Sequence, residues 1–277
     1  MDTRDLFSLK GRTALVTGGS RGIGKMIAEG FIAQGARVYI SSRKADACDR
    51  TAAELSAGGG TCISLPADVS TIDGVRSLAK AYADREPKLD ILVNNAGAAW
   101  LAAFDDFPEK GWNKVMDLNV KTPFFLTQAL APSLRAAASA ERPAKVINIA
   151  SIDGIYLTAN ETYSYVASKS GLIQLTRLMA AKLIKSHIVV TAIAPGPFAS
   201  EMNTAARDRP EDTAARDHAD VVAARTPLGR IGRDEDMAGA AIYLASRAGD
   251  YVVGSVIAVD GGVAFATSGT TQATSQY

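Results

Sequence analysis

Short apolar segments alternate with stretches of helical periodicity from residue 12 to about residue 262, and this alternation constrains the fold more than any other feature. Val75, Leu78, Ala79 and Tyr82, for example, recur at the i, i+3, i+4 and i+7 positions of one helix face. Repeated βα units of this kind form a parallel sheet that helices cover on both faces. The predicted strands are Thr13 to Thr17, Arg37 to Ser41, Thr61 to Leu65, Asp90 to Asn94, Lys145 to Ile149, Ile188 to Ile193 and Val256 to Val259.

No linker interrupts the alternation, so residues 1–266 are predicted to form one α/β domain. The segment at about residues 197–226 departs from the pattern because it is rich in charge and contains TAARD twice. We predict a helical lid there. Residues 267–277 are polar, with almost nothing to bury, and are predicted to form a flexible tail.

The charge balance argues against two classes of partner. Thirty basic residues stand against 29 acidic ones, and a net charge of +1 gives no electrostatic reason to predict binding to nucleic acid or to a membrane. The first 12 residues contain no apolar segment that would serve as a signal peptide or membrane span. Two cysteines without metal-ligand spacing, and two histidines without a ligand cluster, predict a reduced cytoplasmic protein without a metal site.

A glycine-rich sequence, TGGSRGIG at residues 17–24, follows the first predicted strand and opens a helix. In this context Gly18, Gly22 and Gly24 allow backbone amides and the helix N-terminus to approach a pyrophosphate closely. An ordinary tight turn between strand and helix is the alternative interpretation.

Tyr165 and Lys169 are four residues apart in a stretch predicted to be helical, fourteen residues after Ser151. This spacing places the two side chains on one helix face, where an ammonium favours the ionised form of a phenol. A solvated surface pair has the same spacing, so the pair gains meaning only from the other motifs.

The combination of TGGSRGIG, Asn94-Asn95-Ala96-Gly97, Ser151 and Tyr165-x-x-x-Lys169 resembles the short-chain dehydrogenase/reductase family. Asp68-Val69, Pro195-Gly196 and Asp260-Gly261-Gly262 extend the resemblance over nearly the whole chain, in the order of the family. The resemblance implies a Rossmann-type, doubly wound sheet in the order 3-2-1-4-5-6-7, with a dinucleotide bound over the carboxyl ends of the strands.

The resemblance also assigns cofactor contacts. Asp68 and Val69 would contact adenine, Asn95 to Gly97 would lie beneath the ribose and nicotinamide, and Ile193, Pro195 and Gly196 would border the nicotinamide. Ser200 stands where the family usually has a threonine that touches the carboxamide. The complete predicted cofactor set is Gly18, Ser20, Arg21, Gly22, Ile23, Gly24, Ser42, Arg43, Asp68, Val69, Asn95, Ala96, Gly97, Tyr165, Lys169, Pro195, Gly196, Phe198 and Ser200.

The end of the second predicted strand favours NADPH over NADH. An NAD enzyme places an Asp or Glu there for the ribose hydroxyls, but this chain reads Ser41-Ser42-Arg43, with no carboxylate before Asp46. Arg21 and Arg43 supply guanidinium groups suited to a 2′-phosphate.

The resemblance implies a reductase in which Tyr165 donates a proton while hydride reaches a ketone. This role requires the phenol pKa to fall from about 10 to about 7, which we attribute to Lys169 and the oxidised cofactor. Lys169 would also hold the ribose hydroxyls, Ser151 would polarise the substrate carbonyl, and Asn119 would support a water relay to Lys169.

The predicted substrate pocket is mostly apolar, with one acidic member. The residues that line it by resemblance are Ala98, Ala99, Trp100, Asp153, Tyr156, Phe198 and Met202. Arg-x-Gly-Arg at Arg230 to Arg233 and the DGG ending are typical of the 3-oxoacyl-acyl-carrier-protein reductase subgroup, which implies a 3-oxoacyl thioester or another hydrophobic ketone as substrate.

Two alternative functions and two additions stay open. The chain fits an NAD-linked alcohol, polyol or sugar dehydrogenase, or a non-catalytic dinucleotide-sensing protein. Acyl carrier protein, which is acidic, is a candidate partner, and a docking patch of arginines competes here with a solvated lid of mixed charge. A homotetramer or homodimer is predicted through the helices after the fourth and fifth strands. The arginines of that patch are Arg135, Arg142, Arg207, Arg209 and Arg216.

Overall fold

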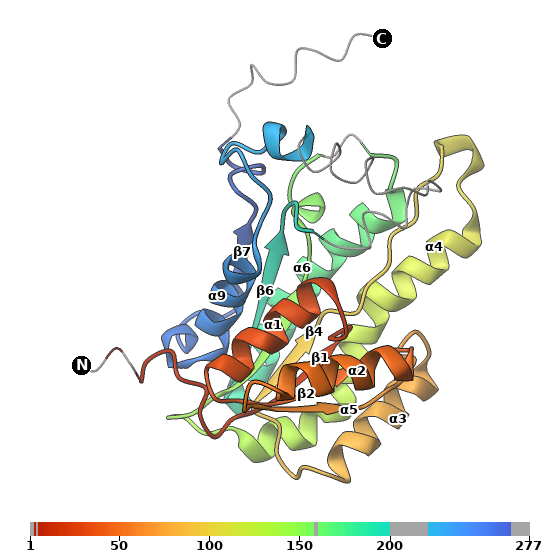
Figure 1. The fold of residues 1–277 in the computed structure, drawn as a ribbon. Coiled ribbons are helices and arrows are strands. Elements are labelled where there is room, and N and C mark those ends of the chain that lie inside the picture. Colours follow the sequence, from red (N-terminus) through yellow and green to blue (C-terminus); the bar gives the residue numbers. More distant parts are fainter. Residues whose placement is uncertain (1–2, 4, 158–159, 200–220, 267–277) are drawn as a thin grey trace.

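A computed structural model describes residues 3, 5–157, 160–199 and 221–266. Its seven strands are parallel and pair in the order β3-β2-β1-β4-β5-β6-β7 (Figure 1), which confirms the predicted fold class. The strands are β1 (Thr13–Thr17), β2 (Arg37–Ser41), β3 (Thr61–Ser64), β4 (Ile91–Asn94), β5 (Ala144–Ile149), β6 (Ile188–Pro195) and β7 (Val256–Val259).

The predicted strand ends differ from the observed ones by at most two residues. The largest difference is at β6, which continues past Ile193 to Pro195 because Pro195 still pairs with Val259 of β7. The predicted lid is described only at 197–199 and 221–226. Both TAARD segments and the predicted tail lie outside the described residues.

Helices cover the sheet in two layers (Figure 1). One face carries α1 (Gly22–Ala33), α2 (Ala45–Ser56) and α9 (Asp234–Ala245), and the other carries α3 (Ile72–Ala83), α5 (Thr122–Ala137) and α6 (Tyr163–Leu183). Strand alternation explains how one sequence serves both layers, since Ala14 and Val16 pack in one core and Leu15 in the other.

The helix that leads into α5 is interrupted by a π-helical turn. α4 (Glu109–Met116) continues through η2 (Asp117–Lys121) into α5, where Pro123 occupies one of the first two positions. Because proline has no backbone N–H, Pro123 cannot donate the hydrogen bond that an α-helix would direct to residue 119. The wider turn places Asn119, which is 1% exposed, toward the interior.

A ladder of buried polar side chains joins β4 and β5 to the helices behind them. Asn94 Nδ2 donates to Asn148 Oδ1 at 2.8 Å, and Asn148 Nδ2 donates to Thr176 Oγ1 of α6 at 2.9 Å. Asn94 Nδ2 also donates to Thr127 Oγ1 of α5 at 3.2 Å. All four side chains are buried, so each bond compensates a group that has lost water.

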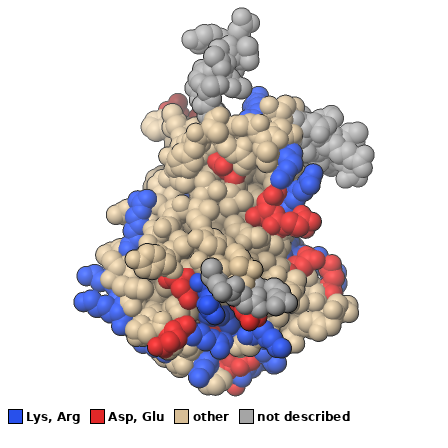
Figure 2. All heavy atoms as spheres, turned by 90° about the vertical axis from the view of Figure 1, so that its left-hand side faces the viewer, with Lys and Arg blue, Asp and Glu red and all other residues tan. Residues whose placement is uncertain are grey.

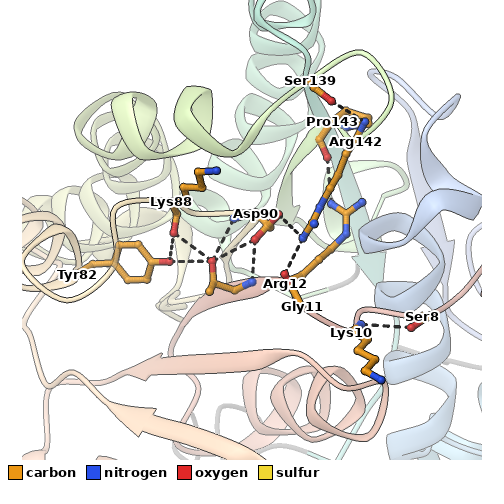
Figure 3. A network of polar contacts seen from close by, with 11 residues as sticks. Ser8, Lys10, Gly11, Arg12, Tyr82, Lys88, Asp90, Ser139, Arg142 and Pro143 are labelled. Atoms are coloured by element: carbon orange, nitrogen blue, oxygen red, sulfur yellow. Dashed lines mark hydrogen bonds and ion pairs between the residues drawn. The ribbon is translucent and has the colours of Figure 1, made fainter.

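A second polar network closes the opposite, amino end of the sheet (Figure 3). Asp90 accepts hydrogen bonds from the Thr13 amide at 2.9 Å and from Arg142 Nη2 at 3.0 Å, and Arg12 Nη1 donates to the Pro143 carbonyl at 3.2 Å. Arg135, on the last turn of α5, lies at the same end because the chain next enters β5. The candidate docking patch near the mouth of the substrate pocket is therefore wrong for Arg135 and Arg142, which lie at the other end of the sheet.

The surface of the protein reflects the nearly equal numbers of basic and acidic residues. On the face shown in Figure 2, basic and acidic side chains are intermingled toward one end, so that region has no field of a single sign. Within the described part of the chain, no helix is both long enough and apolar enough to cross a membrane. Cys48 and Cys62 are buried free thiols.

Removal of the central member of the buried ladder tests its contribution to stability. Asn148→Ala deletes two hydrogen bonds and leaves partner groups of Asn94 and Thr176 buried, so we expect a loss of about 2 to 4 kcal/mol in the free energy of unfolding. Urea unfolding measures this free energy. The matched control, Asn113→Ala on the exposed side of α4, should change it by less than about 0.5 kcal/mol. Equal effects of the two substitutions would contradict the role of the ladder.

Candidate active site

The glycine turn after β1 is shaped for close approach of another group. Gly18 and Gly22 have φ values of +65° and +50°, which side-chain-bearing residues rarely adopt. A Cβ at Gly24 would collide with the Gly18 carbonyl oxygen. α1 starts at Gly22 without a side-chain cap, because the Arg21 side chain at the N-cap has no acceptor for the amides. The amides of this turn are therefore suited to an anion such as a pyrophosphate.

Hydrogen bonds fasten the glycine turn to the loop after β4. Asn95 Nδ2 donates to the carbonyls of Thr17 at 2.9 Å and Gly18 at 3.3 Å. In return, Thr17 Oγ1 accepts from the amides of Asn95 at 3.0 Å and Ala96 at 3.1 Å. The two loops meet where the strand order reverses, which is where doubly wound sheets bind their ligands.

The predicted adenosine end combines exposed cations with a short polar turn. Arg21 and Arg43 are exposed, and Ser42, half-buried between them and the sheet, donates through Oγ to the Lys44 carbonyl at 3.2 Å. The β2 end carries no carboxylate before Asp46. On the neighbouring loop, Asp68 is exposed and Val69 is buried, with the Val69 carbonyl held by Thr122 Oγ1 at 2.5 Å. Ser20 and Ile23 have mainly structural contacts, through Thr51 Oγ1 and the core respectively.

Ser151, Tyr165 and Lys169 come together at the carboxyl end of β5. Ser151 follows the strand and caps the short 3₁₀ turn η3 (Ile152–Gly154), and Tyr165 and Lys169 are one turn apart on α6. Lys169 Nζ donates to the Ile149 carbonyl at 2.7 Å and lies 5.4 Å from the centre of the Tyr165 ring. Tyr163, on another face of α6, instead donates its hydroxyl to Glu161 Oε1 at 2.9 Å.

Asn119 is bonded to the frame of the site. Its Oδ1 accepts from the Ala98 amide at 2.9 Å, and its Nδ2 donates to the Ala98 carbonyl at 2.9 Å and to Ser168 Oγ at 3.0 Å. Ser168 Oγ in turn donates to the Tyr165 carbonyl at 2.8 Å. Sequence analysis missed Ser168, although its place directly before Lys169 on an otherwise buried helix face was a usable signal.

In the protein without cofactor, the pKa of Tyr165 shifts upward, opposite to the predicted direction. Burial raises the pKa of Tyr165 to about 12, hydrogen bonding from the Ser151 side chain lowers it, and the Asp153 carboxylate raises it. Burial also lowers the pKa of Lys169 to about 8, which Asp153 partly offsets. Lys169 still carries most of its charge at pH 7, but burial and Asp153 outweigh the lowering influences, so the protein groups alone do not produce the predicted low pKa of Tyr165.

The segment after β6 forms a tight border. The Gly196 amide donates to the Val259 carbonyl at 2.9 Å, and a Cβ at Gly196 would lie 2.6 Å from the Asp260 Cα atom. Pro195 is buried in the strand. Phe198 is 4% exposed, and its backbone forms an isolated parallel β-bridge with Gly232. Ser200 and Met202 lie outside the described residues, so their predicted roles stay predictions.

The Arg-x-Gly-Arg segment has a structural role at the start of α9. Arg230 donates to both carboxylate oxygens of Asp236, at 2.6 and 3.0 Å, and Asp236 Oδ2 accepts from the Arg233 amide at 2.8 Å. Hydrogen bonding from Arg230 is the largest cause that lowers the pKa of Asp236 to about 2. This segment therefore positions α9 beside the site. In the described part of the chain, no group of three or more His, Cys, Asp or Glu side chains is arranged for a metal ion.

A doubly wound sheet with a glycine turn at its reversal point, beside a buried Ser151 and Lys169 and a half-buried Tyr165, defines the class of dinucleotide-dependent oxidoreductases. The chain belongs to the short-chain dehydrogenase/reductase family, as the sequence predicted. A family model described as enoyl-(acyl carrier protein) reductase matches residues 18–264.

Similar proteins support this membership over nearly the whole chain. The rhamnolipids biosynthesis 3-oxoacyl-[acyl-carrier-protein] reductase of Pseudomonas aeruginosa is 51% identical over 92% of this chain and 97% of its own. Gluconate 5-dehydrogenase of Gluconobacter oxydans is 36% identical over 95% of this chain and 98% of its own. The solved RhlG/NADP active-site complex of P. aeruginosa superposes with a TM-score of 0.88 at 49% identity, covering 94% of this chain and 99% of that one.

Titration of Tyr165 tests the effect of burial on its pKa. Because the folded protein alone raises the pKa of this phenol to about 12, we expect no phenolate from Tyr165 below about pH 10. The measurement is the ultraviolet difference spectrum between the wild type and Tyr165→Phe. Addition of NADP⁺, which brings a positive charge, should move the phenolate signal to lower pH. Ionisation near pH 7 without cofactor would contradict this electrostatic description.

Proposed function

We propose that this protein is an NADPH-dependent reductase that converts the ketone of a 3-oxoacyl thioester, or of a similar hydrophobic carbonyl compound, into an alcohol. The observation that carries the proposal is the group of Ser151, Tyr165 and Lys169 at the carboxyl end of β5, in a chain 51% identical to a 3-oxoacyl reductase. Bound NADPH supplies hydride to the carbonyl carbon in this chemistry.

Each residue of the group has a proposed task. Ser151 donates a hydrogen bond to the substrate oxygen, so that negative charge developing there is stabilised. Tyr165 transfers its proton to that oxygen, and its high pKa in the protein alone keeps it protonated for this step. Lys169 binds the nicotinamide ribose and passes a proton toward Tyr165. Asn119 and Ser168 keep α6 in register with the loop after β4.

The proposed cofactor site runs along the carboxyl ends of the strands. Gly18 to Gly24 hold the pyrophosphate, and Arg21, Ser42 and Arg43 hold the 2′-phosphate. Two similar solved proteins support NADP(H): the RhlG/NADP complex and a gluconate 5-dehydrogenase of Burkholderia cenocepacia in complex with NADP and tartrate, which is 35% identical with a TM-score of 0.84 and covers 95% of this chain and 98% of its own. The other members are Asp68, Val69, Asn95, Ala96, Gly97, Pro195, Gly196, Phe198 and Ser200.

Carrier, assembly and location are further parts of the proposal. The substrate is delivered on acyl carrier protein. Two or four copies associate through α5 and α6, where Phe124, Phe125 and Leu178 are 38%, 37% and 57% exposed. The protein acts in the cytoplasm.

Turnover of a substrate panel tests the proposed reaction. With NADPH, the enzyme should reduce 3-oxoacyl thioesters faster than 5-ketogluconate, and Tyr165→Phe should lower kcat about 10²- to 10⁴-fold because the proton donor is lost. NADPH absorbance measures the rate. Tyr163→Phe is the matched control and should keep activity, since that hydroxyl bonds Glu161. Full activity of Tyr165→Phe would overturn the site assignment, and a preference for the sugar acid would favour the dehydrogenase alternative.

Cofactor preference depends on the two arginines. Arg21→Ala and Arg43→Ala should each weaken NADPH binding about 10- to 100-fold and leave NADH binding nearly unchanged, because each removes a charge-assisted contact to the 2′-phosphate. Calorimetric titration of both cofactors measures this. Arg50→Ala, at an exposed position of α2, is the control. Tighter binding of NADH than of NADPH by the wild type would defeat the proposal.

A further inference from the structure

Asp153 lies in a turn that is fixed to the site at both ends. Its amide donates to Ser151 Oγ at 3.1 Å, which ties the start of η3 to Ser151. At the other end, a Cβ at Gly154 would lie 2.7 Å from the carbonyl carbon of Lys169, and Ser170 Oγ donates to the Gly154 carbonyl at 3.3 Å. The turn that carries Asp153 is therefore held between Ser151 and the helix of Tyr165 and Lys169.

The charge of the Asp153 carboxyl group acts on three titratable side chains. Two of them, Tyr165 and Lys169, are on α6, and the third, Tyr156, follows η3. Asp260, in the turn after β7, adds a second negative charge that acts on Tyr156. Burial raises the pKa of Asp153, whereas Lys169 lowers it. Among these groups, the negative charges of Asp153 and Asp260 therefore outnumber the one positive charge of Lys169.

We propose that Asp153 is a specificity-determining residue that rejects ketones with a carboxylate beside the reacting carbonyl and admits neutral 3-oxoacyl esters and thioesters. This inference rests on the proposed function. A substrate oxygen bound by Ser151 and Tyr165 brings the adjoining group of the substrate next to η3. If that group is a carboxylate, it meets the Asp153 charge in a partly buried site, where like charges repel more strongly than in water.

The ammonium of Lys169 offsets this repulsion only in part. Its Nζ is already hydrogen-bonded to the Ile149 carbonyl at 2.7 Å, and Asp153 and Asp260 both contribute negative charge around Tyr156. A thioester, in contrast, has no charge next to its keto group, so it escapes the repulsion. The proposal thereby separates 3-oxoacyl substrates from free 3-oxo acids of the same carbon skeleton.

A matched pair of ketones tests the inference. Ethyl 3-oxobutanoate and 3-oxobutanoate share the reacting carbonyl and differ in the charge beside it. The ratio of their kcat/KM values with NADPH would be measured for the wild type, Asp153→Asn and Asp153→Glu. Asp153→Ser is a second neutral variant should Asp153→Asn fail to fold, and Glu141→Gln, exposed at the amino end of the sheet, is the charge control.

We expect the wild type to prefer the ester, and a neutral residue at position 153 to reduce that preference about tenfold through faster use of the anion. Asp153→Glu and Glu141→Gln should keep the wild-type ratio. A ratio that stays within about twofold in Asp153→Asn and Asp153→Ser would overturn the inference.

Binding separates this inference from the proposed reaction. The affinities of the enzyme–NADP⁺ complex for the two ketones would be compared by calorimetry for the same variants. If the wild type reduced neither ketone, the proposed function would fail, yet a neutral variant with relatively tighter binding of the anion would still support the role of Asp153. Unchanged relative affinities would overturn that role by themselves.

Discussion

Hydrogen bonds between the ends of β1 and β4 hold the arrangement on which the site depends. Asn95 Nδ2 binds the carbonyls of Thr17 and Gly18, and Thr17 Oγ1 receives two amides from the other loop. The two loops follow neighbouring parallel strands, and the chain then continues to opposite sides of the sheet because the strand order reverses between β1 and β4. Doubly wound sheets bind their ligands at such a point, and the hydrogen bonds between the two loops hold them there in one arrangement. Side chains at Gly18 or Gly24 would displace Asn95, so the glycines serve this contact as well as the phosphate approach.

The remaining site residues are positioned by helices that contact the loop after β4. The π-helical turn before Pro123 directs Asn119 inward, where it binds both the Ala98 backbone and Ser168 of α6. The same helix carries Tyr165 and Lys169, and the buried ladder through Asn148 and Thr176 fixes it against β5. Polar bonds in a dry interior require good geometry, so these contacts restrict α6 more tightly than apolar packing alone.

Electrostatics within this frame oppose ionisation of Tyr165. Burial has the largest effect on its pKa, and Asp153 adds to it. A protonated tyrosine suits ketone reduction, in which the phenol gives up a proton. The reverse oxidation requires phenolate and therefore a further positive charge. In our proposal the oxidised nicotinamide supplies that charge, which links proton transfer to the presence of cofactor.

Local patterns in the sequence were enough to predict the seven strands. The resemblance to a known family predicted their order and the grouping of Ser151, Tyr165 and Lys169. The strand predictions succeeded because strand and helix periodicities are short-range, and because glycine and proline act on their own backbone, whereas the roles of the site residues stay predictions. The strand order itself is confirmed. The arginine patch failed at Arg135 and Arg142, since which end of a sheet a residue reaches depends on chain direction through the fold. The partners of Asn119, the part played by Ser168, the high pKa of Tyr165 and the position of Asp153 between Ser151 and α6 were decided only by the tertiary structure, because burial and charge contacts join residues far apart in the chain.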